Sequence, residues 1–271
     1  MENVAQTTPI VVATRNRGKI TEIQALLKPF PVDIKDLSQF GPIPPVVEDG
    51  ATFEANAYKK ASQVARVLGL PALADDSGLC VEALDGRPGV HSARYGGQGL
   101  SDRQRAKLLL DEMAGLTNRK AQFVCVLSLA VPAGPALTYE AHCDGQVTEM
   151  PAGDNGFGYD PIFFYPALGK TFAQISRAEK ARVSHRGKAL AELMSEFDKV
   201  LMWIDMQMPA LDGPHEPTKG ERACLKPAKA WTYSPRSVRS KAPRLPRPCW
   251  WTRWTKSNWP SWRRFKTPMP S

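Results

Sequence analysis

The sequence has few features that would stabilise a protein outside the cytoplasm or anchor it in a membrane. Its five cysteines are scattered and form no Cys-x-x-Cys pair, which argues against a disulfide framework and against a zinc site. The longest apolar run, residues 123–131, is far shorter than the roughly 20 residues that span a bilayer. No secretory-signal pattern opens the sequence. We therefore expect a cytoplasmic protein with reduced thiols and no membrane partner.

Most of the chain, residues 1–205, also lacks a net positive charge. Residues 206–271 hold 14 of the 36 Lys and Arg residues but only 3 of the 27 Asp and Glu residues, so this segment carries +11 and residues 1–205 carry −2. The same segment contains 11 of the 24 prolines and six of the seven tryptophans. We therefore divide the chain into a globular domain, residues 1–205, and a basic Pro/Arg/Trp-rich tail, residues 206–271.

The tail has no sustained helical or strand period, and its prolines break most possible helices. Such a segment cannot bury enough apolar surface to offset its ordering entropy, so we expect it to be disordered. A disordered or frame-shifted end without a selected function is one interpretation. Nucleic-acid binding is the alternative, because the tail ends in tryptophans interleaved with arginines, which can stack on bases and contact phosphates. That affinity would fall steeply with salt and vanish on truncation after Asp205.

Strand and helix signals alternate through the globular domain in the order β-α-β-α-β-α-β-β-α. Residues 10–13 and 72–74 are short apolar runs typical of buried strands, and residues 121–131 and 137–148 indicate an antiparallel pair. Apolar periodicity predicts helices around residues 20–27, 53–68, 101–113 and 190–201, with Thr52 and Ser101 as caps of the second and third. This order predicts an α/β domain with a mixed sheet.

A polar loop follows the first predicted strand and opens the first predicted helix. Free N–H groups at a helix start carry partial positive charge and suit an anion. Gly18 allows close backbone approach and Lys19 supplies a charge, but the loop lacks the first glycine and the Ser/Thr of a Walker A motif. A phosphate site and a capped polar turn both remain open. The loop consists of Thr14, Arg15, Asn16, Arg17, Gly18 and Lys19.

Acidic residues follow one predicted strand and precede one predicted helix. Asp75 and Asp76 close the strand at residues 72–74 and begin a turn, at the carboxyl end where α/β sheets bind ligands. Consecutive strand residues point to opposite faces, so we expect the two carboxylates to have different roles. Glu48 and Asp76 together suit Mg²⁺, which usually takes only one or two protein carboxylates. A solvated Asp-Ser-Gly turn and an acidic helix entrance are the alternatives.

Residues 156–161 place two glycines around an aromatic ring, followed by an acid and a proline. This composition is typical of a shaped loop rather than a core strand. Phe157 can stack on a base, and Asp160 can accept hydrogen bonds from one. The alternative is a structural turn with a core aromatic.

A second cationic segment precedes the last predicted helix. Ser184 can cap that helix, which would place His185 and Arg186 at its N-terminus beside Lys180. Such a group can clamp an anion or a base. The alternative is a structural histidine.

These segments together resemble the inosine triphosphate pyrophosphatase family, also described as dITP/XTP or non-standard purine NTP pyrophosphatases. Each block is weak alone, but six in the family's order across residues 10–203 are specific; the tail has no counterpart. The blocks are Thr14-x-Asn16-x-Gly18-Lys19, Glu48-Asp49-Gly50-x-Thr52-Phe53-x-x-Asn56-Ala57-x-x-Lys60-Ala61, Ala74-Asp75-Asp76-Ser77-Gly78-Leu79, Pro88-Gly89-Val90-x-Ser92-Ala93-Arg94-Tyr95, Gly156-Phe157-Gly158-Tyr159-Asp160-Pro161-Ile162-Phe163 and Ser184-His185-Arg186-Gly187.

The resemblance implies an elongated α/β fold, in which a mixed sheet and flanking helices form two lobes around a central cleft, and a homodimer. It implies that residues 14–19 bind the triphosphate, with Lys60 adding positive charge. Glu48 and Asp76 would hold Mg²⁺, and Asp76 would also activate the attacking water. The remaining substrate contacts would come from Ser77, Phe157, Gly158, Tyr159, Asp160, Lys180, His185 and Arg186.

These implications predict Mg-dependent hydrolysis of ITP, dITP and XTP to the nucleoside monophosphate and pyrophosphate, which cleanses the nucleotide pool. A donor facing the purine 6-carbonyl would be left unpaired by adenine, at a cost of roughly 1–3 kcal/mol. Guanine also carries a 6-carbonyl, so its rejection requires a further contact near position 2 that the sequence does not reveal. A Maf-like pyrophosphatase acting on other modified nucleotides is the nearest alternative enzyme.

Overall fold

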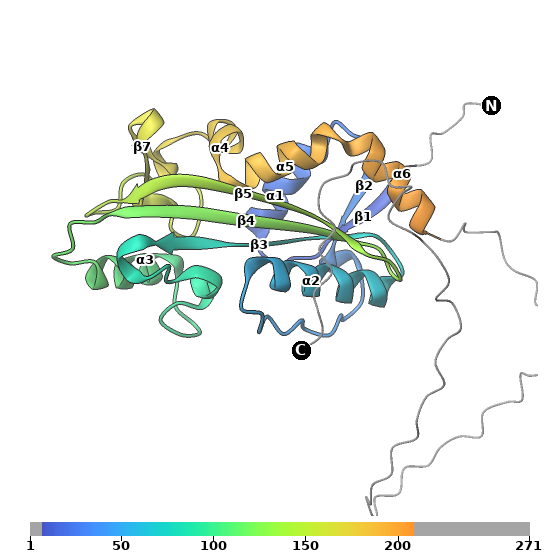
Figure 1. Ribbon diagram of the computed structural model, residues 1–271, viewed down its shortest axis with the longest axis horizontal. Coiled ribbons are helices and arrows are strands. Elements are labelled where there is room, and N and C mark those ends of the chain that lie inside the picture. The colour runs from blue at the N-terminus through green and yellow to red at the C-terminus, as the bar shows by residue number, and fades with distance from the viewer. Residues whose placement is uncertain (1–6, 209–271) are drawn as a thin grey trace, which may run out of the picture. The chain divides into compact units, whose positions relative to one another are not determined.

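The computed structural model describes residues 7–208, which form a seven-stranded mixed sheet with helices on both faces (Figure 1). The strand order is β2-β1-β3-β4-β5-β6-β7. The predicted α/β class and mixed sheet are therefore confirmed. The strands are β1 (Thr8–Val12), β2 (Val32–Asp36), β3 (Ala72–Val81), β4 (Lys120–Ala130), β5 (Ala136–Val147), β6 (Phe163–Tyr165) and β7 (Lys170–Thr171).

The α-helices begin where the sequence places capping side chains. Thr52 and Ser101 accept hydrogen bonds from the first turns of the second and third helices, as predicted, and Ser184 does the same for the fifth. None of the helices in residues 7–208 combines the length and apolar character needed to cross a membrane. The helices are α1 (Arg17–Leu27), α2 (Phe53–Leu68), α3 (Asp102–Glu112), α4 (Arg177–Val183), α5 (His185–Ser195) and α6 (Phe197–Gln207).

Strand β3 joins the parallel and antiparallel parts of the sheet. β1 pairs in parallel with β2 and β3, whereas β3, β4 and β5 are successively antiparallel. β2 supplies the strand that the predicted order places between the first two helices, and the predicted antiparallel pair corresponds to β4 and β5. β3 carries Asp75, Asp76 and Ser77 between the helices of the two faces.

The strand that contains the two aspartates is longer than predicted. β3 continues to Val81, so the turn expected at Asp75 and Asp76 is wrong. Registered pairing with β4 keeps the backbone extended along all ten residues of β3. Two buried carboxylates are tolerated inside this strand because cationic side chains from neighbouring helices reach them.

The helix predicted over residues 190–201 is in fact two helices. α5 ends at Ser195 and α6 begins at Phe197, with Glu196 between them at φ −128° and ψ 25°. The break lets the Phe197 ring pack at 4.4 Å from the Phe30 ring centroid. α6 runs to Gln207, two residues beyond the boundary drawn at residue 205. Nearly all of the predicted disordered tail lies outside the described residues.

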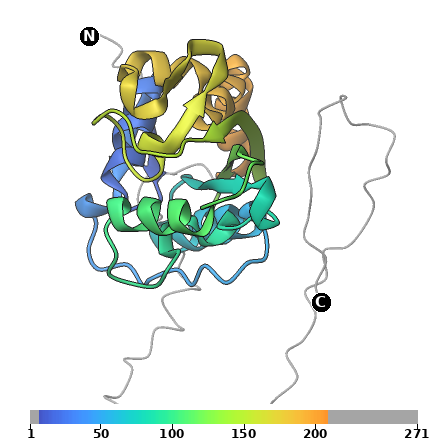
Figure 2. The same ribbon diagram turned by 90° about the vertical axis from the view of Figure 1, so that its left-hand side faces the viewer.

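Helices cover both faces of the sheet (Figures 1 and 2). Three hydrophobic clusters stabilise the domain on these faces. One packs α1, α5 and α6 against the sheet through residues such as Ile23 and Leu190. Another packs α2 against the opposite face through small residues such as Ala61. The third gathers α3, β6 and the 172–175 segment around Phe123.

An open edge on β3 determines where a site can form. β1 is registered with β3 only at Ala72 and Leu73. Beyond Leu73, that edge of β3 has no long strand partner in the described part of the chain, and it meets only an isolated bridge between Cys80 and Pro88. Loops and helix ends therefore surround the second half of β3.

Candidate functional site

The two adjacent aspartates of β3 point to opposite faces of the sheet, as the alternation of strand residues predicts. Asp75 contacts Lys19 of α1 and Arg186 of α5. Asp76 contacts Lys60 of α2. Two adjacent positions of β3 thus connect two polar clusters, one on each face.

Asp75 lies at the centre of a buried ionic network. Its carboxylate forms ion pairs with Lys19 and with Arg186, whose Nε lies 2.9 Å from Oδ2, and it also accepts from the Cys125 thiol at 3.0 Å. Burial acts against its charge, but the Arg186 and Lys19 charges outweigh burial and hold the pKa of Asp75 well below its usual range. Asp75 therefore stays ionised and orients both cations.

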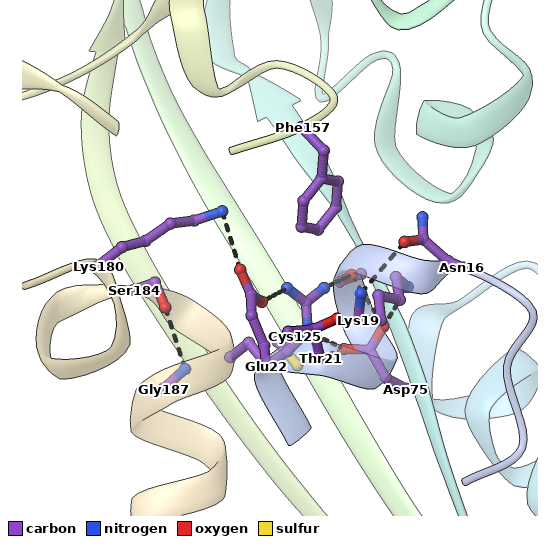
Figure 3. A network of polar contacts seen from close by, with 12 residues as sticks. Asn16, Lys19, Thr21, Glu22, Asp75, Cys125, Phe157, Lys180, Ser184 and Gly187 are labelled. Atoms are coloured by element: carbon purple, nitrogen blue, oxygen red, sulfur yellow. Dashed lines mark hydrogen bonds and ion pairs between the residues drawn. The ribbon is translucent and has the colours of Figure 1, made fainter. Parts of the chain in front are cut away.

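Glu22 of α1 links two of the predicted base-binding cations (Figure 3). Its carboxylate lies 2.5 Å from Nη1 of Arg186 and 3.2 Å from Nζ of Lys180. Nη2 of Arg186 also donates to Ser77 Oγ at 2.9 Å. Glu22 was not among the predicted site residues, although it lies three residues after Lys19 and therefore on the same helix face.

The predicted 156–161 segment is a fixed loop. Asp160 Oδ2 accepts from the Phe157 backbone N–H at 2.9 Å and from Lys180 Nζ at 2.6 Å. The Gly158 N–H donates to Asp102 of α3 at 2.8 Å. Lys180 Nζ lies 4.6 Å from the Phe157 ring centroid, within range of a cation–π contact. The loop therefore holds an aromatic ring against a cation.

Tyr159 belongs to the wall of the site rather than to its polar lining. The side chain is buried, and its hydroxyl donates to the Ser92 carbonyl at 2.9 Å. Ser92 in turn accepts from the Leu79 N–H at 2.9 Å. A Cβ at Gly78 would lie 2.4 Å from Ser92 Oγ, so this close approach requires glycine. These contacts explain why a Pro-Gly-Val-x-Ser segment accompanies the aspartate strand.

His185 is buried, with its ring stacked 4.6 Å from the Phe123 ring at an interplanar angle of 10°. Burial, and then the charge of Arg186, lower its pKa well below the usual value. The imidazole is therefore neutral at pH 7. Its Nδ1 is buried and has no hydrogen-bond partner within residues 7–208.

We expect His185→Gln to flatten the dependence of stability on pH between about pH 7 and 5.5, a window set by the ordinary histidine pKa. The His185 imidazole binds a proton near pH 6.5 in the unfolded chain but stays neutral at that pH in the folded chain. The folded state therefore loses stability as pH falls below about 6.5. Removing the imidazole should abolish about 1 kcal/mol of that loss. Urea unfolding at several pH values measures the free energy of unfolding as a function of pH. If this free energy changes with pH by the same amount in wild type and His185→Gln, the histidine is not buried and neutral.

Most of the predicted substrate-binding residues line one cavity of ≈ 310 Å³ beside the open edge of β3. Gly18 borders a neighbouring cavity that shares Phe157 and Lys180 with the first. The predicted residues that line the first cavity are Asn16, Lys19, Ser77, Phe157, Gly158, Tyr159, Asp160, Lys180, His185 and Arg186.

Two residues of the predicted phosphate loop lie elsewhere. Thr14 and Arg15 border another cavity, of ≈ 540 Å³, between α1 and residues 36–43, and Arg17 borders both this cavity and the one that Gly18 borders. Arg15 donates from Nη2 to the Ile43 carbonyl at 3.3 Å. The structure therefore does not bring Arg15 together with Lys19 in the cavity beside β3.

The predicted metal ligands meet at Lys60 on the α2 face of β3. Lys60 Nζ lies 2.8 Å from Asp76 Oδ1 and 3.5 Å from Glu48 Oε2, which places both carboxylates beside one cation. Burial opposes the Lys60 charge, but Asp76 and Glu48 outweigh it and raise the pKa of Lys60. Burial also raises the pKa of Asp76, despite the nearby Lys60 charge.

The Asp76 carboxylate retains an oxygen free for a ligand. Oδ2 is buried and has no hydrogen-bond partner in the described part of the chain. Across residues 7–208, no group of three or more His, Cys, Asp and Glu side chains is placed to hold a metal. Two carboxylates with one orphaned oxygen fit Mg²⁺, which keeps several positions for water and phosphate.

Gly18 connects the phosphate loop to the aromatic ring. A Cβ built on Gly18 would lie 2.7 Å from Cδ1 of Phe157, closer than side chains tolerate. Alanine is otherwise preferred over glycine inside a helix by about 1 kcal/mol. The glycine therefore serves the approach of the Phe157 ring and not the stability of α1.

We expect Gly18→Ala to raise the KM for the substrate about tenfold, because displacing a packed ring costs roughly 1–3 kcal/mol. Gly41→Ala is the matched control, since a Cβ there meets nothing within 4 Å. The effect should shrink in a Phe157→Leu background, where the rigid ring is absent. Steady-state kinetics on the wild type, the two single variants and the double variant measure the coupling between Gly18 and Phe157. Additive effects of the two substitutions on KM would contradict the coupling.

Comparison with known proteins gives consistent matches over the described domain. The model of the Ham1 family matches residues 10–196. A dITP/XTP pyrophosphatase from Syntrophobacter fumaroxidans is 64% identical over 195 residues, which cover 72% of this chain and 84% of that relative. A second dITP/XTP pyrophosphatase, from Desulfotalea psychrophila, is 50% identical over 212 residues, 78% of this chain and 95% of the relative. The solved structure of a HAM1 protein from Coxiella burnetii aligns with a TM-score of 0.67 at 38% identity, covering 71% of this chain and all of that one.

Proposed function

This chain belongs to the Ham1 family, and we propose that it hydrolyses non-standard purine nucleoside triphosphates to the nucleoside monophosphate and pyrophosphate. Its relatives named dITP/XTP pyrophosphatase support a nucleoside triphosphate pyrophosphatase activity. The observation that carries the proposal is the convergence on β3: a cation-lined cavity beside Ser77, and the carboxylates of Asp76 and Glu48 around Lys60 on the α2 face.

The phosphate end of the substrate would lie at the start of α1. The first N–H groups of a helix favour an anion, and Asn16 fixes this turn by accepting from the Lys19 N–H at 3.1 Å. Lys19 and Lys60 add positive charge from the two faces of β3. Hydrolysis of a polyphosphate needs this positioning and charge stabilisation more than covalent chemistry.

Glu48 and Asp76 would hold Mg²⁺, which when bound supplies further stabilisation of phosphate charge. The Asp76 carboxylate accepts the proton of the water that attacks the α-phosphorus, and burial, which raises its pKa, strengthens it as a proton acceptor. As the new P–O bond forms, the bond between the α-phosphorus and the bridging oxygen breaks. The electron pair leaves with pyrophosphate.

The base end would lie between Phe157 and the cations of α4 and α5. The Phe157 ring offers a stacking surface, while Lys180 and Arg186 present hydrogen-bond donors to the cavity. These donors match the 6-carbonyl of hypoxanthine and xanthine. Adenine presents an amino donor at that position and leaves a buried donor unpaired, which discriminates strongly.

A pyrophosphate-release panel with ITP, dITP, XTP, GTP and ATP tests the proposal. We expect pyrophosphate and a monophosphate from the first three substrates, much slower turnover of ATP, and loss of activity when Mg²⁺ is chelated. Release of orthophosphate, or equal turnover of ATP, would contradict the proposed reaction. A preference for modified pyrimidine nucleotides would favour the Maf-like alternative.

We also propose that the enzyme is a cytoplasmic homodimer. The nucleotide pool that such an activity cleanses is cytoplasmic. Light scattering on the purified chain distinguishes a dimer of the 29.9 kDa chain from a monomer.

A further inference from the structure

Helix α3 contributes a cation to the cavity that the proposed function does not use. Arg105 and Asp102 both line the cavity, on the wall formed by α3. The Arg105 side chain is only 15% exposed. None of the predicted site residues lies on this helix.

The hydrogen bonding of Arg105 is incomplete. Nη1 lies 3.2 Å from Asp102 Oδ1. Nε is buried, and nothing in residues 7–208 accepts its N–H. A guanidinium has five donors and no acceptor, and a buried donor without a partner is costly. Arg105 therefore has donor capacity that an acceptor on a ligand would satisfy.

Arg105 is held beside the loop that carries the stacking ring. Asp102 pairs with Arg105 through Oδ1 and accepts the Gly158 N–H through Oδ2 at 2.8 Å. α3 lies on one face of the sheet, whereas α4 and α5 lie on the other (Figure 1). Donors thus enter the cavity from two walls, Arg105 from one wall and Lys180 and Arg186 from the other.

We propose that Arg105 contacts the 2-position of the purine and makes the site selective for xanthine nucleotides, an inference that rests on the proposed function. If Lys180 and Arg186 hold the 6-carbonyl, the 2-position, which lies across N1 on the same edge of the pyrimidine ring, would approach Arg105 on the α3 wall. Xanthine presents a carbonyl acceptor at position 2, hypoxanthine a hydrogen atom and guanine an amino donor. A guanidinium satisfies only the first.

The same contact explains how the site rejects GTP. Guanine shares the 6-carbonyl of the accepted bases, so the α4 and α5 cations alone do not exclude it. At the 2-position its amino group would face the donors of Arg105, leaving donors of both partners unpaired in a buried place. Arg105 therefore strengthens the binding of XTP and weakens that of GTP, whereas it changes the binding of ITP little.

Three variants test this inference with the full-length chain. Arg105→Gln removes the charge, and Arg105→Lys keeps the charge but loses the planar donor arrangement. Arg103→Gln is the matched control, because it makes the same change two residues away on the exposed side of α3. We would measure kcat/KM for XTP, ITP and GTP at fixed Mg²⁺, with melting temperatures as the check on folding.

We expect Arg105→Gln to lower kcat/KM for XTP about tenfold and to change ITP less than about twofold, so that GTP gains relative to XTP. Arg105→Lys should lie between wild type and Arg105→Gln, and it carries the test if the glutamine variant fails to fold. Equal losses for XTP and ITP would overturn the inference and assign Arg105 to holding the Gly158 loop. If Arg105→Gln left the kcat/KM of XTP unchanged relative to those of ITP and GTP, the inference would also be overturned. A wild type that cleaves none of the three substrates would overturn the proposed function itself.

Discussion

Asp76→Asn should lower kcat about a thousandfold, the range expected when a positioned general base is removed. The asparagine is nearly isosteric, so the cavity and the backbone of β3 stay in place. It removes the carboxylate whose Oδ2 has no partner in residues 7–208 and whose Oδ1 lies 2.8 Å from Lys60. Rate constants for pyrophosphate release from ITP measure the change.

The melting temperature of the Asp76→Asn protein distinguishes a loss of catalysis from a loss of folded protein. Burial disfavours the Asp76 charge, as its raised pKa indicates, and Lys60 keeps Glu48 at 3.5 Å after the substitution. We therefore expect the melting temperature to shift by less than about 5 °C. Asp33→Asn, an exposed carboxylate on β2, is the control and should retain wild-type turnover. An Asp76→Asn protein within tenfold of wild type would refute the role of Asp76 as the base.

Arg186→Met should destabilise the fold by roughly 3–5 kcal/mol, because it breaks two buried ion pairs and leaves Asp75 with Lys19 alone and Glu22 with Lys180 alone. Asp75 and Glu22 both pair with Arg186, whose side chain is only 2% exposed. A domain of this size loses about 2–4 °C of melting temperature per kcal/mol, so the transition should fall by ~10 °C. Chemical denaturation of the two proteins measures the difference.

The pH dependence of that difference identifies the pair responsible. The pKa of Asp75 is lowered in the folded state, so its contribution is present above the unfolded-state value and is lost as pH falls toward the folded-state value. The gap between wild type and Arg186→Met should therefore narrow below about pH 4. Adding Asp75→Asn to Arg186→Met should cost less stability than Asp75→Asn costs in the wild type, by at least about 1 kcal/mol, because the ion pair between Asp75 and Arg186 is already absent.

An exposed arginine provides the control for this experiment. Arg182 lies on the solvent side of α4, and Arg182→Met should change stability by no more than about 0.5 kcal/mol. Equal effects of the two arginine substitutions would mean that the buried network adds nothing to the fold.

The sequence predicted the elements because their signals are local. Thr52 and Ser101 specify helix starts through hydrogen bonds within one turn, and the apolar runs specify strands through burial. It failed at Asp75 and Asp76, where local composition indicates a turn. Pairing with β4, a strand about 50 residues away, decides the backbone there.

The chemistry of the site divides in the same way. The residue types at Lys19, Asp76 and Phe157 follow from the sequence, because spacing and side-chain chemistry indicate anion, metal and base contacts. The partners of these residues do not follow from the sequence. Glu22 and Arg105 join the site only because α1 and α3 fold around the open edge of β3. The sequence by itself determined the α/β class, the capped helices and the candidate side chains. Only the tertiary structure decided which carboxylate meets which cation, because an ion pair buried between distant segments depends on how those segments pack.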